Sequence, residues 1–85
     1  MTSLHIINHL ADVKTCQALI ADTDAVLLCG DAVYALRQPL GLTHRLYALA
    51  EDVQARGLES FNQAKSVDYP EFVALCASYT KVVAW

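Results

Sequence analysis

The sequence predicts an α/β fold of three layers, in which a mostly parallel sheet of about five short strands is flanked by helices. Short runs rich in β-branched and aliphatic residues alternate with helix-like segments, and only short connections join them. Residues 25–29 are continuously apolar, which is typical of a parallel strand covered on both faces. Because the chain has 85 residues, we expect one domain spanning residues 1–85.

The first strand is expected at residues 4–8, where Leu, His and two Ile precede Asn8. A helix follows at about residues 13–21, and Asp12 is placed to cap it. Its apolar face is formed by residues spaced as in a helix, namely Val13, Cys16 and Ile20. The continuously apolar run at 25–29 is then the second strand, and we expect it to be central.

The next helical stretch is predicted at residues 32–38, directly after Asp31. Pro39 and Gly41 follow and are expected to close it, since neither residue favours continuation of a helix. Residues 45–49 form the third predicted strand.

A short helix is expected at residues 51–56, and Gly57 stands where a helix commonly ends on a left-handed residue. A weak strand follows near residues 66–67. The last strand is predicted at residues 81–84.

Between these two strands lies the clearest helix start in the chain. Asp68 is followed three residues later by Glu71, the spacing of a capping box, and Pro70 fits the first turn. The helix should run to about Ser78. We expect three of its side chains to anchor it on the sheet: Tyr69, Phe72 and Leu75.

The composition favours a protein that binds other proteins. Hydrophobic residues make up 55% of the chain and charged residues 18%, more apolar surface than so small a core can hold. We therefore expect self-association of the isolated chain. The net charge of −3 argues against direct nucleic-acid binding. No run is long enough for a membrane span, and the first residues do not suggest export, so a cytoplasmic location without membrane contact is expected.

The three cysteines, Cys16, Cys29 and Cys76, include no CxxC pair, so zinc and thioredoxin-type chemistry both lack their usual spacing. No cofactor is expected. Cys29 follows a strand and precedes a helix, where amides and the helix dipole could lower its pKa; the alternative is a packed strand residue. Helical spacing places Cys76 at the centre of an apolar stripe. Cys16 shares a face with apolar residues and is interpreted as a packed thiol, or as one at the margin of its stripe with partial exposure. We therefore expect alkylation of Cys16 first, then Cys29, then Cys76.

Two histidines bear on catalysis, because a Cys–His pair would suggest a nucleophile and its base. His5 lies within a strand and is interpreted as packed or hydrogen-bonded. His9 lies at a strand end, a better place for a base, but no third group is apparent to orient it. The chain is poorly equipped to be an enzyme on its own.

Several strings, in this order and at these distances, resemble the TusB/DsrH family over the whole chain. The most specific are YALAEDVQARGL at residues 47–58 and VDYPEFVAL at residues 67–75. The others are LH at 4–5, VLL at 26–28 with DAV at 31–33, and AW at 84–85. The sequence departs from the family at Ala32, where glycine is common, and in its compact segment at 38–43.

This resemblance implies a DsrEFH-like fold and a subunit of a sulfur-relay assembly. Such a subunit combines with TusC/DsrF-like and TusD/DsrE-like subunits into a dimer of heterotrimers. In the Tus branch the assembly passes persulfide sulfur toward 2-thiolation of the tRNA wobble uridine, and in the Dsr branch it serves sulfur oxidation. In the Tus case this subunit would contact tRNA only indirectly, through its partners. The sulfur-carrying cysteine belongs mainly to the TusD/DsrE-like partner, which implies a structural, non-catalytic role here.

Cys16 keeps a second hypothesis open. It falls where DsrH-branch members carry a cysteine in the first helix, so it is a candidate persulfide site. The sequence thus leaves two interpretations: an interface-forming subunit of a sulfurtransferase complex, or a DsrH-type sulfur carrier that uses Cys16. It does not distinguish the Tus branch from the Dsr branch.

Overall fold

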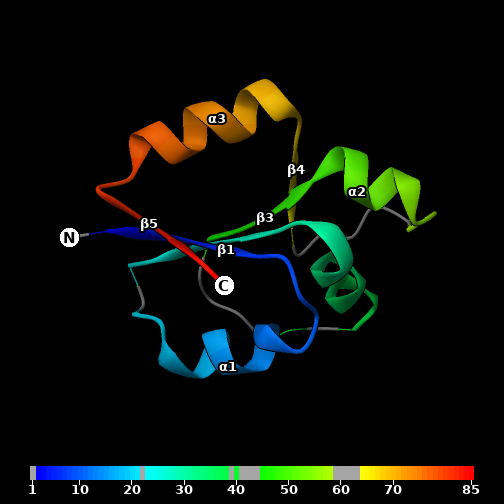
Figure 1. The fold of residues 1–85 in the computed structure, drawn as a ribbon, viewed down its shortest axis with the longest axis horizontal. Coiled ribbons are helices and arrows are strands. Elements are labelled where there is room, and N and C mark those ends of the chain that lie inside the picture. Colours follow the sequence, from blue (N-terminus) through cyan, green and yellow to red (C-terminus); the bar gives the residue numbers. More distant parts are fainter. Residues whose placement is uncertain (1, 22, 39, 41–44, 59–63) are drawn as a thin grey trace.

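The computed structural model describes residues 2–21, 23–38, 40, 45–58 and 64–85. Within these ranges the chain forms one five-stranded parallel sheet with helices on both faces (Figure 1), as the sequence predicts. The strands are β1 (Ser3–Ile7), β2 (Ala25–Leu28), β3 (Arg45–Leu49), β4 (Lys65–Val67) and β5 (Lys81–Ala84). The helices are α1 (Asp12–Leu19), the 3₁₀ helix η1 (Gly30–Arg37), α2 (Ala50–Ala55) and α3 (Tyr69–Ser78).

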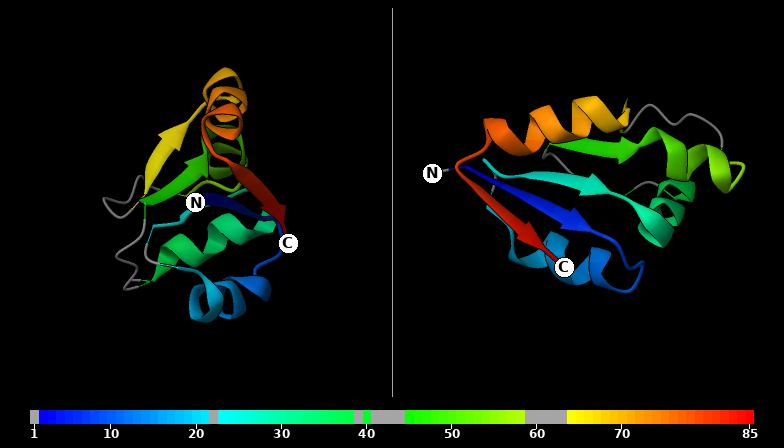
Figure 2. Two further views of the ribbon diagram at one scale, coloured as in Figure 1. Left: turned by 90° about the vertical axis from the view of Figure 1, so that its left-hand side faces the viewer. Right: turned by 45° about the horizontal axis from the view of Figure 1, so that its top comes forward.

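The strand order β4-β3-β2-β1-β5 determines which helix covers which face. From β1 to β4 each strand is added on the same side of the preceding one, whereas the step from β4 to β5 returns to the opposite edge. Parallel connections are almost always right-handed, so this reversal places α3 on the other face from α1, η1 and α2. Figure 2 shows α3 alone above the sheet, with α1 below it.

Alternation along the strands divides the core into two clusters. Side chains of one parity, such as Val26 and Leu28, face α1, η1 and α2. Side chains of the other parity, such as Leu4 and Leu27, face α3. Every residue of β2 is buried, which confirms the prediction of a central strand covered on both faces.

Local signals account for most element boundaries. Asp68 accepts a hydrogen bond from the backbone N–H of Glu71 at 2.8 Å, and the Glu71 carboxylate accepts one from the N–H of Asp68 at 3.1 Å. The predicted capping box of α3 is therefore confirmed. Gly57, just after α2, has a φ of +63°, the left-handed conformation that ends a helix.

Two helix starts differ from the prediction. Asp12 lies in the first turn of α1 and does not cap it, because Ala11 is already helical and precedes it without a side-chain cap. The stretch expected at residues 32–38 begins at Gly30 and is a 3₁₀ helix, with Asp31 inside its first turn. The predicted helix stop at Pro39 and Gly41 lies outside the described residues.

Of the three side chains predicted to anchor α3 on the sheet, two do so. Phe72 and Leu75 are half-buried against the cluster beneath the helix, but Tyr69 is 55% exposed. No residue of α3 is fully buried, because this helix covers its side of the sheet alone. Cys76, expected at the centre of an apolar stripe, is likewise only half-buried.

Candidate functional site

The carboxyl ends of β1, β2 and β3 meet at one edge of the sheet, the place where parallel sheets usually bind ligands. Gly30 follows β2 there with a φ of +52°, and its N–H donates to Oδ2 of Asp52 at 2.8 Å. A Cβ at position 30 would collide with the side-chain amide oxygen of Asn8. Glycine is therefore required for this turn by both its conformation and the space around it.

Arg56 binds two acidic residues at this edge, Asp31 and Asp52. Its guanidinium donates from Nη2 and Nε to Oδ1 of Asp31, at 2.9 and 3.1 Å, and its Nη1 lies 3.6 Å from Oδ1 of Asp52. The same guanidinium lies 5.8 Å from the ring centre of Tyr34. Together these contacts join η1 to the last turn of α2. The carboxylates are thus used to fix the two helices against each other.

Cys29 lies at the same edge, immediately after β2. Its thiol donates toward the carbonyl oxygen of Ile7 at 3.6 Å and lies 4.0 Å from Oδ1 of Asn8. Burial raises the pKa of Cys29, and the nearby carboxylate of Asp52 raises it further, while Arg56 partly offsets both. The pKa reduction considered for this strand-end thiol is therefore not found.

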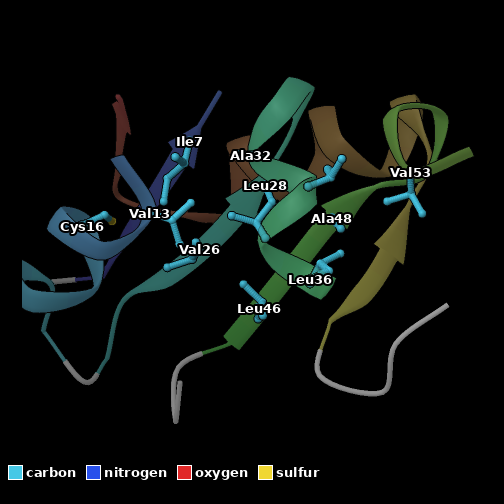
Figure 3. Packing of buried hydrophobic residues seen from close by; sticks show 11 residues of the cluster. Ile7, Val13, Cys16, Val26, Leu28, Ala32, Leu36, Leu46, Ala48 and Val53 are labelled. Atoms are coloured by element: carbon cyan, nitrogen blue, oxygen red, sulfur yellow. The ribbon is translucent and has the colours of Figure 1, made fainter. Parts of the chain in front are cut away.

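Cys16 lies on the inner face of α1 and is fully buried, with 0% of its surface exposed. Figure 3 shows it among the apolar residues that α1 and η1 press against the sheet. Burial raises the pKa of Cys16 to about 11, and the carboxylates of Asp24 and Asp12 contribute in the same direction. The structure contradicts the placement on which the expected order of alkylation rests, because Cys29 and Cys76 are half-buried and Cys16 is enclosed.

His5 and His9 fall where the sequence places them. His9 is exposed in the turn after β1. His5 is hydrogen-bonded, as expected: its Nε2 lies 3.0 Å from Oδ2 of Asp24 and its Nδ1 accepts from Nε1 of Trp85 at 3.1 Å. Asp24 was not singled out from the sequence, and Trp85 was named only as part of the AW string that resembles the family. Their proximity to His5 becomes visible only when β1 is known to lie between β2 and β5.

None of the three thiols, all of which lie in the described part of the chain, is freely exposed. The same ranges, 2–21, 23–38, 40, 45–58 and 64–85, contain no group of three His, Cys, Asp or Glu side chains suited to a metal ion. Among the described helices, none is long and apolar enough to cross a membrane.

Apolar side chains remain exposed on the outer layers. On α3, Tyr69 and Val73 are 55% and 56% exposed, and Val82 of the edge strand β5 is 41% exposed. On the opposite face, Leu19 of α1 and Leu10 in the turn before α1 are exposed. This exposure agrees with the apolar excess in the composition, and it provides surface on which other proteins could bind.

Comparison with known proteins agrees with the strings described above. A family model described as DsrH-like protein matches residues 8–82. Proteins called TusB from Salmonella arizonae, Salmonella paratyphi B and Salmonella newport are each 34% identical to this chain over 94 aligned positions. Each alignment covers 96% of this chain and 99% of the relative. Since both comparisons extend over nearly the whole sequence, the chain belongs to the TusB/DsrH family.

Proposed function

We propose that this protein is a non-catalytic subunit of a cytoplasmic sulfur-relay complex, which supports persulfide transfer toward 2-thiolation of the tRNA wobble uridine. Membership of the TusB/DsrH family supports the sulfur-relay assignment. The curated relatives named above are called TusB, which favours tRNA thiolation over sulfur oxidation. Its partners in this proposal are TusC/DsrF-like and TusD/DsrE-like subunits, arranged as a dimer of heterotrimers.

The burial of Cys16 is the main observation that supports a non-catalytic role. A persulfide carrier must present its sulfur to a donor and then to an acceptor, and the attacking form is the thiolate. Cys16 has no exposed surface and a pKa raised to about 11. A carrier role for Cys16 would need α1 to move away from the sheet in every cycle.

The exposed surface of α3 supports a role in assembly. A helix that lies alone on its face of the sheet and still exposes Tyr69 and Val73 offers an apolar surface to a neighbouring subunit. The net charge of −3 favours contact with tRNA through partners rather than directly.

Cells that lack the native gene provide the test of the Cys16 question. We would express the wild-type chain or Cys16→Ala and measure 2-thiouridine in tRNA by mass spectrometry. The alanine variant should support thiolation to the wild-type level, since it removes sulfur without placing a polar group in the core. Loss of thiolation by a variant that is folded and present at normal levels would instead establish Cys16 as a carrier.

Co-purification provides the test of assembly. The chain co-expressed with its two partner types should elute far above its own mass of 9.3 kDa. Val73→Asp should release it from the partners while leaving its own circular dichroism unchanged, because Val73 is exposed. Leu19→Asp on α1 is the matched control, and it should leave the complex intact. If Val73→Asp has no effect on assembly, α3 is not the interface.

A further inference from the structure

Three segments far apart in the sequence bring the side chains of His5, Asp24 and Trp85 together. His5 comes from β1, Asp24 immediately precedes β2, and Trp85 immediately follows β5. Figure 2 shows β5 lying beside β1, in agreement with the pairing of His5 with Val83. The side chains of His5 and Asp24 are only 12% and 11% exposed. The ring centres of His5 and Trp85 lie 6.2 Å apart.

The contacts determine where the proton of neutral His5 resides. The indole N–H can only donate, so Nδ1 of His5 must present a lone pair to Nε1 of Trp85 at 3.1 Å. The ring proton is then on Nε2, which donates to Oδ2 of Asp24 at 3.0 Å. Neutral His5 thus satisfies both neighbours at once.

Asp24 is held as a charged acceptor. Burial raises the pKa of its carboxyl group, but the hydrogen bonds from His5 and from the backbone N–H groups of Ala21 and Ser3 outweigh burial and lower it. Asp24 therefore remains ionised throughout the range in which histidines usually change charge, about pH 5 to 8.

A second proton on His5 is incompatible with this arrangement. It would place an N–H on Nδ1, facing the N–H of Trp85, so that two donors would meet and the indole would lose its acceptor. The contact with Asp24 would at the same time become an ion pair, which keeps the imidazolium in place. On α1, Cys16 lies close enough to Asp24 and Asp12 for both carboxylates to raise the pKa of its thiol, which is neutral in this range of pH. The strand neighbours of His5 are Val26 and Val83, which do not titrate.

We propose that His5 is a pH-sensitive latch on the edge strand β5: neutral His5 holds Trp85 in place, and protonated His5 releases it. Trp85 is half-buried against the cluster beneath α1, and its backbone N–H donates to the carbonyl oxygen of Ile6 at 2.9 Å. Among the described strands, β5 pairs only with β1. Release of the Trp85 side chain therefore removes a contact that holds the end of β5 against its neighbour. Acidification therefore loosens β5 and uncovers that side of the core.

Fluorescence reports directly on this latch, because Trp85 is the only tryptophan in the sequence. We would follow emission and acrylamide quenching of the full chain between about pH 8 and pH 5. Acidification should shift the emission to the red and increase quenching, with the ratio of docked to free Trp85 falling about tenfold when the hydrogen bond is lost. In His5→Asn, whose amide oxygen can replace Nδ1 as acceptor but does not titrate, this transition should vanish. His9→Asn is the matched control and should retain it.

A second measurement uses the wild-type chain alone, so it does not depend on a variant that folds. The indole Nε1–H resonance of Trp85 should exchange slowly with solvent at about pH 8 and rapidly near pH 5, in step with titration of the His5 ring nitrogens. The nitrogen spectrum should show the Nε2–H tautomer at the higher pH. A proton on Nδ1 of neutral His5, or an indole N–H that stays protected while His5 titrates, would overturn the proposal. A quenching transition that persists in His5→Asn would overturn it as well.

Discussion

The reactivity of Cys16 toward an alkylating reagent provides the sharpest test of the core. Burial raises its pKa from an ordinary 9.0 to about 11. At pH values well below 9 the thiolate fraction of Cys16 is therefore about one hundredth that of an ordinary thiol, from ionisation alone. Because the side chain has no exposed surface, the reagent must also wait for α1 to open, which slows the reaction further.

The assay is native labelling with iodoacetamide followed by mass spectrometry of the cysteine peptides. Cys29 and Cys76 should be modified first, and Cys16 more than about 100-fold more slowly than a free thiol compound at the same pH. In urea all three cysteines should react at similar rates. The rate at Cys16 should keep rising above pH 9, where an ordinary thiol levels off.

The same pKa shift makes the stability of the folded chain depend on pH. A thiol whose pKa is raised by folding stabilises the native state below pH 9.0, and this stabilisation is lost as the pH rises toward about 11. Wild-type protein should therefore lose stability over that interval relative to Cys16→Ala. Labelling of Cys16 in the folded chain as fast as of Cys29 would refute the reasoning from burial and would restore the carrier hypothesis.

Three further changes test the local structure, each by urea denaturation. Asp68→Ala removes one half of the capping box and should cost about 1 kcal/mol, whereas an unchanged midpoint would mean that the cap contributes nothing. Gly30→Ala should cost at least about 1 kcal/mol, because φ is +52° and the new methyl group meets Asn8; equal stability would show that the turn relaxes freely. Phe72→Ala should cost about 1–3 kcal/mol, less than for a fully buried ring, since Phe72 is half-buried and contacts Tyr69 edge-on. A loss above about 4 kcal/mol would indicate that α3 is enclosed more tightly than the structure shows.

The sequence was sufficient wherever the signal is local. The strand at 45–49 and the strand at 81–84 have the predicted bounds, and the capping box between Asp68 and Glu71 is formed as expected. These features depend on alternation, on turn residues and on side chains three positions apart, all of which are visible along the chain. The prediction that Asp12 caps α1 was wrong because a capping residue and an acidic residue of the first turn look alike in a sequence. The helical backbone of Ala11 places Asp12 in the first turn.

Tertiary structure decided how deeply each side chain is buried and which distant residues meet. Helical periodicity predicts which face of a helix a side chain lies on, but not how much of the protein packs over that face. Cys16 is enclosed because α1 shares its face with η1 and α2, whereas Cys76 is half-buried because α3 covers the other face alone. The contact between His5 and Trp85, 80 positions apart, exists because β5 crosses back to pair with β1. Strand order is set by the packing of the whole chain, and no local pattern encodes it.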